Sequence, residues 1–416
     1  MVLFKIKNLV NSRRFFIAMF AAVALLHFLL YWLLGIAVVI PNKNIVPLRY
    51  LFELHEDLFW DLKYAQTFLA NPLALYFSNA YLVSNLQYLP AFMLYDVPWY
   101  MASLGFGSFP DNLDQALILY DFSMVLWNLL NCFLIYKIMR ANKVQAMLGN
   151  SVLRNPFIVM CLYIGPSIFF IDYWVGQDNA ILGFFLLFGI LCYVNDKEHL
   201  TYLIWGIGLW FKTIIAIFII VLILHGPLKR LVKNVAFLAI SQVPNAILFI
   251  LYPSLLQDFM YNVVFRLGSP LIFNIPVNMV QFLYQYFNVN IGASYIILFC
   301  SLMPLTVYAF IECRASMRFF DKLMILALVF HNFIQGEPNH VIITLGIYVL
   351  WIATRNLGLH GSIRYLKFLL GIPFLSGLLW LIFPFNPIIY FSGLIWLDLA
   401  FIFPEKARFN KVKQVV

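Results

Sequence analysis

LTYLIWGIGLWFKTIIAIFIIVLIL, residues 200–224, is an apolar run with one charged side chain, Lys212. A run of this length could cross a bilayer as one helix, which takes about 20 apolar residues. The segments on both sides of it, residues 196–199 and 225–234, carry basic residues and are expected on the cytoplasmic side, so one crossing would break the alternation of the chain. Two half-helices that meet near Lys212 satisfy the pattern. The sequence therefore predicts a broken helix there.

The composition of the whole chain indicates a polytopic membrane protein. The 416 residues are 63% hydrophobic and 11% charged, whereas soluble domains carry roughly 25% charged residues. So few charges cannot cover the surface of a water-soluble protein of this size. The apolar runs are long rather than alternating, which favours helices. We therefore expect an all-α protein with about ten to twelve transmembrane helices, including the half-helix pair.

The positions of the basic residues predict the orientation of the chain. The net charge is +9, and most of the 27 Lys and Arg residues fall at the two termini or in short loops that the alternation places on one side. This pattern marks cytoplasmic loops, so both termini are expected in the cytoplasm and no nucleic-acid partner is expected. The exceptions are Lys43, Arg49, Lys63, Lys212 and Arg266.

We expect a single transmembrane domain over residues 1–416 with two large extracytoplasmic or lumenal loops. The first loop, residues 42–114, contains many of the acidic residues and should form juxtamembrane helices; the second is residues 252–290.

Within the first loop, residues 88–106 are moderately apolar but contain two prolines and an aspartate. We assign them to the outer membrane surface; a full crossing is the alternative, and it would place most of the bases outside. The other predicted membrane segments are residues 15–40, 116–136, 157–170, 180–194, 235–251, 293–311, 323–333, 341–353, 366–383 and 388–403.

Several polar side chains on the outer side are candidates for chemistry. Asp57, Asp61 and Tyr64 would share one face of a helix, where carboxylates suit acid/base catalysis or cation binding, although their spacing alone favours solvated charges on a surface helix. Lys212 is costly in a membrane and is expected to face a polar cavity. Arg266 suits a phosphate group. The remaining candidates are His340 at the mouth of a helix, and Gln177, Asp178 and Asn179 at a helix start, where they cap the helix or contact a substrate.

The sequence contains no pattern that indicates a cofactor. The five cysteines lack metal-ligand spacing, and the chain has no Walker loop and no glycine-rich dinucleotide turn. We therefore expect no cofactor and assign no metal site, and the spacing of the first-loop carboxylates does not decide whether a metal assists.

Several short motifs follow one another along residues 57–352. They are Asp61-Leu-Lys-Tyr64, Asn71-Pro-Leu-Ala-Leu-Tyr76, Tyr88-Leu-Pro90, Gly176-Gln-Asp-Asn179, Gly206-Ile-Gly208 with Lys212, Arg266, and Asn339-His340. Their order resembles the GT-C superfamily of membrane glycosyltransferases, and within it the polyprenyl-phosphate-mannose-dependent mannosyltransferases. The late motif Glu337-Pro-Asn-His340 lacks the aromatic residue that often follows this histidine in the family.

The resemblance implies a glycosyltransferase of glycolipid biosynthesis. A sugar, most often mannose, would move with inversion from a polyprenyl-phosphate donor to a lipid or glycan acceptor on the extracytoplasmic or lumenal face. Asp61 would be the general base, and Lys212, Arg266 and His340 would bind the donor phosphate. The residues implied to contact substrates are Asp57, Tyr64, Gln177, Asp178 and Asn179.

Two other functions are compatible with parts of the sequence. A membrane transporter or lipid flippase would share the helices, the broken helix and the intramembrane charge, but transporters often show two related halves, and none is visible here. A glycan polymerase or ligase would use similar lipid-linked substrates, but it should show more outer arginines than Arg49 and Arg266.

Overall fold

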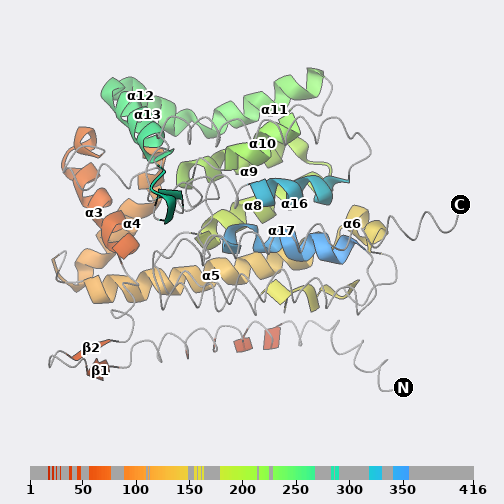
Figure 1. Cartoon of the computed structure of the whole chain (residues 1–416), viewed down its shortest axis with the longest axis horizontal. Coiled ribbons are helices and arrows are strands. Elements are labelled where there is room, and N and C mark those ends of the chain that lie inside the picture. Colours follow the sequence, from red (N-terminus) through yellow and green to blue (C-terminus); the bar gives the residue numbers. More distant parts are fainter. Residues whose placement is uncertain are drawn as a thin grey trace, which may run out of the picture.

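The computed structural model describes about half of the chain, and the described part is helical apart from two short strands (Figure 1). The all-α prediction is confirmed at this level. The strands, β1 (Ala37–Val39) and β2 (Ile45–Pro47), pair antiparallel, so the first apolar run does not stay helical to residue 40 as expected. The described residues are 17–18, 21–22, 25, 29, 37–39, 45–47, 56–75, 89–108, 111, 113–148, 154–156, 158–160, 162–163, 179–212, 215–223, 228–267, 283–284, 286–289, 318–329 and 341–355.

Several helices lie along the long axis of the molecule (Figure 1). The longest is α5 (Leu113–Arg140), which packs against α8 (Asn179–Val194). Most residues of α8 are buried and none is exposed, because it also contacts α9 (Glu198–Phe211) and α17 (Val341–Thr354). Large side chains fill this centre, and Trp205, Tyr202 and Trp351 are completely buried. The helix α8 is therefore the core around which the others assemble.

The two ends of this bundle differ. One end, which we call the α4 end, carries α3 (Glu56–Ala70), α4 (Met93–Ser103), α12 (Val243–Leu251) and α13 (Pro253–Leu267) (Figure 1). The other, which we call the Asp196 end, carries the turn between α8 and α9 and the short helix α6 (Asn142–Met147). Asp196 takes a positive φ of 62°, and the Lys197 N–H donates to Cys192 O at 2.9 Å, which closes this turn tightly. The remaining short elements are η2 (Pro72–Ala74), η3 (Pro90–Phe92) and η4 (Leu104–Phe106).

The apolar run 200–224 is interrupted at Lys212, as the sequence predicted. Lys212 has extended backbone angles and ends α9, and α10 (Ala216–Ile223) follows it. The Trp205 and Phe218 rings lie 6.2 Å apart, and a Cβ on Gly208 would meet Ile215. These pairs are symmetric about the break, so α10 runs back antiparallel to α9.

The next helix, α11 (Leu228–Ser241), runs parallel to α9. At the start of α9, Glu198 Oε1 accepts from Nδ2 of Asn234 in the middle of α11 at 3.0 Å, and further along α9 Gly206 O accepts from Nε2 of Gln242, just after the end of α11, at 2.6 Å. The chain therefore starts α9 and α11 at the same end of the molecule. This arrangement preserves the alternation that the basic residues required.

The helix pair α11 and α12 is bent by 54° at Gln242, with Pro244 in the first turn of α12. The predicted membrane segment over residues 235–251 lies within this pair and contains the bend, since the proline ring cannot continue the α11 hydrogen-bond pattern. Of the described helices, none alone combines the length and the apolarity of a membrane crossing, whereas this bent pair does so jointly.

The other predicted segments agree with the structure to different extents. The predicted outer-surface segment 88–106 contains η3, α4 and η4, which together run from Pro90 to Phe106, and Pro98 lies inside α4. The helix α16 (Phe319–Val329) begins four residues before the predicted start of the segment 323–333, whose last four residues lie outside the described residues. The predictions over residues 293–311, 366–383 and 388–403, and most of those over 15–40 and 157–170, lie outside the described residues.

Candidate functional site

The centre of the candidate site is a buried contact between Lys212 and Asn179. The Lys212 Nζ donates to Asn179 Oδ1 at 2.9 Å, and the two residues are 5% and 0% exposed. Lys212 lies at the break after α9, and Asn179 is the first residue of α8. An amide oxygen is a neutral acceptor, so this bond orients the ammonium group without cancelling its charge. The sequence predicted both residues as site residues, and the structure brings them together.

A polar network on α5 continues from this contact. Asn131 donates from Nδ2 to Ala180 O and to the Tyr163 hydroxyl, both at 2.9 Å. The Tyr163 hydroxyl in turn donates to Asn128 Oδ1 at 3.2 Å. Among the described residues, Asn131 Oδ1 and Asn128 Nδ2 have no hydrogen-bond partner although both are buried. Buried polar atoms of this kind are normally satisfied, so they indicate a place for water or a polar ligand group.

Sequence reasoning missed this network. Asn128 and Asn131 are three residues apart in a helix and so project from one face of α5. Two asparagines on one face of a long apolar segment were the available signal, since a buried amide needs partners.

The first-loop segment attaches directly to the end of α9. The Leu89 N–H donates to Trp210 O at 3.2 Å, and the Ala91 N–H donates to Asn245 Oδ1 at 2.8 Å. Trp210 Nε1 also donates to Ser241 O at 3.0 Å, so η3, α9 and the bend between α11 and α12 are tied together. The chain next to Lys212 is therefore held by polar contacts from two directions.

Aromatic side chains complete this attachment around Phe211, the residue before Lys212. Its ring lies 5.2 Å from Phe92, 5.4 Å from Tyr95 and 5.3 Å from Phe185. The Tyr95 hydroxyl is also within hydrogen-bond distance of Trp127 Nε1, at 3.4 Å. Burial raises the pKa of Tyr95, so the phenol stays neutral.

Three ionisable or polar groups of the first loop are buried at the α4 end. Asp61 is 4% exposed and Tyr64 is 2% exposed, both on α3, and Asp96 on α4 is 1% exposed. A carboxylate that loses this much water must interact with polar partners, and both aspartates do so. The alternative of a solvated surface helix is wrong for Asp61, since its side chain faces the interior.

The remaining predicted site residues are not brought together by the described part of the structure. Asp57 lies on α3 and Arg266 lies on α13, but their side chains are outside the described residues. Gln177, Asp178 and His340 also lie outside the described residues.

Lys212 supplies a buried cation, a group that suits an anion such as a phosphate. The amide groups of Asn179, Asn131 and Asn128 and the Tyr163 phenol lie around the start of α8. Within the described ranges, no group of three or more His, Cys, Asp or Glu residues is close enough to hold a metal ion. The first loop, which carries buried Asp61, packs at the same end of α9 as Lys212. No family model, curated protein or solved structure matches this chain.

Proposed function

We propose that this protein is an integral membrane glycosyltransferase that moves a sugar, most often mannose in the family it resembles, from a polyprenyl-phosphate donor to a lipid or glycan acceptor. The observation that carries the proposal is the attachment of the first-loop segment to the chain next to Lys212, through the Leu89–Trp210 backbone hydrogen bond and the Phe92–Phe211 ring contact. The buried Asp61 carboxylate and the buried Lys212 ammonium therefore lie at the same end of the bundle.

The membrane setting is supported by the outer surface of the bent pair α11–α12. Its apolar side chains are exposed at positions where a water-soluble protein would carry polar residues. Lipid is the solvent that makes such a surface favourable. Those that are more than half exposed are Val232, Ile240, Ile247, Ile250 and Leu251.

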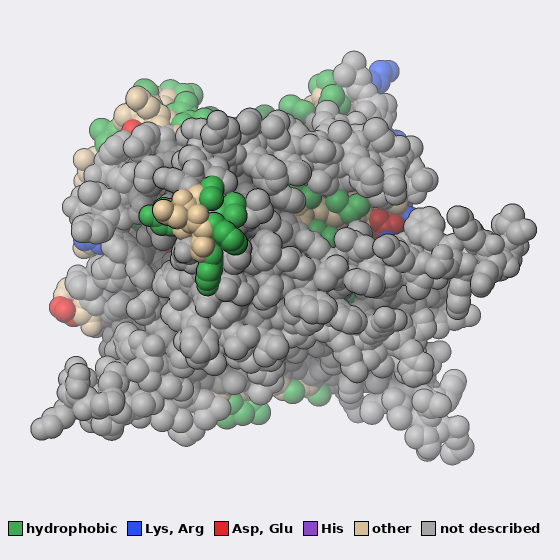
Figure 2. Space-filling model, in the orientation of Figure 1, with side chains coloured by type: hydrophobic (Ala, Val, Ile, Leu, Met, Phe, Trp, Pro, Cys, Tyr) green, Lys and Arg blue, Asp and Glu red, His purple; other side chains and the backbone are tan. Residues whose placement is uncertain are grey.

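The distribution of charge supports the same setting. On the face shown in Figure 2, the described charged side chains lie toward the two ends of the molecule, and the described side chains visible between them include hydrophobic groups and no charged ones. The Asp196 end carries the bases that the sequence assigned to the cytoplasm, among them Lys143, Arg230 and Lys233. The α4 end is then extracytoplasmic or lumenal, and the proposed site faces that side. The number of crossings follows the sequence prediction of about ten to twelve, including the α9–α10 half-helix pair.

The proposed reaction uses Asp61 and Lys212 in separate roles. Asp61 accepts the proton of the acceptor hydroxyl as the hydroxyl oxygen forms a bond to the anomeric carbon of the sugar. The bond from that carbon to the donor phosphate oxygen breaks on the opposite side, which inverts the configuration. The polyprenyl phosphate leaves with the electron pair, and the Lys212 ammonium stabilises the charge that develops on it. Arg266 and His340 are further proposed phosphate ligands.

Transfer by purified variants tests the proposal. The full chain in liposomes is supplied with a radiolabelled polyprenyl-phosphate sugar and a crude lipid acceptor, and Asp61→Asn is compared with Asp111→Asn. Asp111 is an exposed aspartate of the same loop and provides the matched control. We expect Asp61→Asn to lose about 100-fold or more of the rate and Asp111→Asn to retain it.

The same preparation separates the competing functions. Transfer at the wild-type rate in Asp61→Asn would exclude Asp61 as the general base. Movement of the labelled lipid across the bilayer without any transfer would favour the transporter or flippase function instead. Products that lengthen with time would indicate a glycan polymerase.

A further inference from the structure

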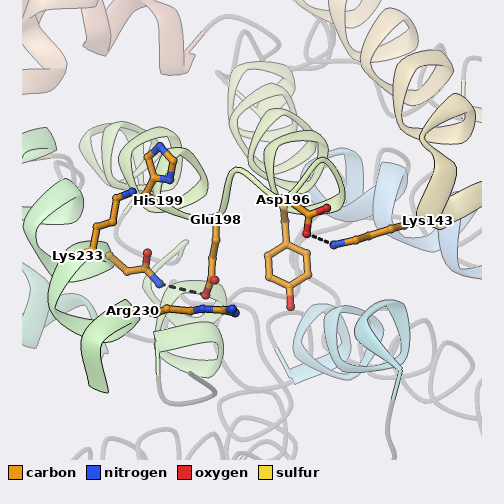
Figure 3. Close-up of a pocket in the computed structure, with 8 residues that line it drawn as sticks. Lys143, Asp196, Glu198, His199, Arg230 and Lys233 are labelled. Atoms are coloured by element: carbon orange, nitrogen blue, oxygen red, sulfur yellow. Dashed lines mark hydrogen bonds and ion pairs between the residues drawn. The ribbon is translucent and has the colours of Figure 1, made fainter. Parts of the chain in front are cut away.

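A cavity lies at the Asp196 end, at the other end of the bundle from the proposed transfer site (Figure 3). Its volume is about 370 Å³, within the range of small-ligand pockets. The turn between α8 and α9, the first turn of α9, one face of α11 and the start of α6 enclose it. The lining residues are Lys143, Tyr193, Asp196, Glu198, His199, Arg230, Lys233 and Asn234.

The two carboxylates of this cavity already have partners. Lys143 forms an ion pair with Asp196 across the cavity, from α6 to the turn. Asn234 donates from Nδ2 to Glu198 Oε1 at 3.0 Å. The Asp196 charge is therefore balanced, and Glu198 is fixed in orientation by a neutral amide.

Two basic residues of α11 also line the cavity, and neither forms an ion pair with Asp196 or Glu198. Arg230 and Lys233 are three residues apart, so they project from the same face of the helix. Neither forms an ion pair with another described residue. In Figure 3 the Arg230 side chain extends below Glu198 toward the middle of the cavity, and Lys233 points toward His199. The cavity thus presents a guanidinium and an ammonium on one wall.

We propose that this cavity binds the phosphate group of a phosphate ester through Arg230 and Lys233. A guanidinium donates two parallel N–H bonds to phosphate oxygens, and an ammonium adds a point charge. Lys143 lies on the opposite wall, where its ion pair with Asp196 limits its contribution. Glu198 repels the bound anion and lowers the affinity. In the proposed orientation the cavity opens at the cytoplasmic membrane surface, so the phosphate comes from a lipid headgroup or from a soluble ester. This inference does not depend on sugar transfer.

Binding to the full chain in detergent tests the proposal. Inorganic phosphate is the probe, and calorimetry at constant ionic strength measures its affinity. We expect Arg230→Gln with Lys233→Gln to weaken binding by about tenfold or more, since each lost contact is a hydrogen bond to a charged group. Lys229→Gln removes the same charge from an exposed neighbour on α11 that does not line the cavity, and it should leave the affinity unchanged.

Glu198→Gln keeps the proposal testable if the double variant fails to fold. This change removes the repelling charge and should strengthen phosphate binding. No saturable binding by the wild type, equal loss in Lys229→Gln and in the double variant, or weaker binding by Glu198→Gln would each overturn the proposal.

Lipid nanodiscs identify the source of the phosphate. Phosphatidic acid that remains bound to the wild type in native mass spectrometry, but not to the double variant, supports a lipid headgroup. Displacement of inorganic phosphate by glycerol phosphate, with no retained phosphatidic acid, supports a soluble ester. Retention of phosphatidic acid that is equal in the wild type and the double variant would argue against a phosphate site here.

Discussion

Lys212 Nζ donates to Asn179 Oδ1 at 2.9 Å, which joins the break after α9 to the first residue of α8. The two residues are 33 positions apart in the sequence, and the closed turn at Asp196 returns the chain so that they meet. The contact therefore depends on how α8 and α9 pack, and changes that disturb this packing should move Lys212.

Substitution of Lys212 tests its role in stabilising the leaving phosphate. Lys212→Met should lower the transfer rate by about 100-fold, because it removes one buried donor aimed at developing charge. Asn179→Ala should lower the rate less, because the ammonium remains but is no longer oriented. The double variant should be no slower than Lys212→Met, since both changes act on one group. Additive losses would show that Asn179 acts independently; Lys229→Met is the control.

Gly206 tests how tightly α9 packs against α11. A Cβ at Gly206 would lie 2.8 Å from Ser241 Cβ and 2.9 Å from Leu238 Cδ1. Gly206→Ala should therefore lower the free energy of unfolding by about 1–3 kcal/mol through overpacking. Thermal unfolding in detergent measures the change. Gly105→Ala has open space around the added Cβ and should be neutral or slightly stabilising; equal effects of the two changes would contradict the packing.

Substitution of Asp321 tests whether an ion pair between α16 and the end of α17 stabilises the fold. The Asp321 carboxylate forms an ion pair with Arg355, with 3.1 Å between Oδ1 and Nη2, and accepts hydrogen bonds from Arg318 Nε at 3.0 Å and from Trp351 Nε1 at 2.9 Å. The Asp321 and Arg355 side chains are only 14% and 11% exposed. Asp321→Asn should cost about 2–3 kcal/mol of unfolding free energy, because Arg355 would keep its charge in a poorly solvated position.

The exposed pair Lys143–Asp196 provides the matched comparison for that change. Its side chains are 48% and 78% exposed, so Asp196→Asn should cost less than about 1 kcal/mol. Asparagine also tolerates the left-handed backbone that Asp196 adopts, so no strain is added. A larger loss for Asp196→Asn than for Asp321→Asn would reverse the expected order.

The burial of Asp258 on α13 leads us to expect a specific dependence of the unfolding free energy on pH. Burial raises the pKa of its carboxyl group in the folded protein. The folded state therefore holds this proton more tightly than the unfolded state, and the contribution to stability is present below the ordinary carboxyl pKa and is lost as the pH rises through the folded pKa. Asp258→Asn should flatten this part of the stability curve, measured as the unfolding midpoint against pH. An unchanged slope would assign the pH dependence to other groups.

Local pattern predicted the helices whose ends carry clear signals. The predicted 180–194 matches α8 to within one residue, because the Asp-Asn start and the Asn-Asp-Lys turn are both visible in the sequence. The break at Lys212 was predictable because the basic segments on both sides constrain the path. The bend at Gln242 was missed although Pro244 is present, since a proline in the first turn of a helix and one in its interior look alike in sequence.

The candidate site was only partly predictable for a physical reason. Lys212 and Asn179 stand out because a charged residue in an apolar run and a polar helix start are local features. Asn131 and Asn128 join them only because α5 packs against the start of α8, and sequence spacing does not report packing between distant helices. The cavity at the Asp196 end was missed for the same reason. The sequence placed its basic residues in cytoplasmic segments, but it did not show that their side chains line one cavity.

The attachment of the first loop has a consequence for how freely its sequence can vary. Both hydrogen bonds that hold residues 89–91 are donated by main-chain amides, of Leu89 and Ala91. Every amino acid except proline supplies such an amide, so at the half-buried Leu89 most substitutions keep this hydrogen bond. Ala91 is fully buried, so its position admits only small side chains as well as excluding proline. Side-chain character can therefore vary at residue 89 while the loop keeps its register, whereas residue 91 is restricted in size.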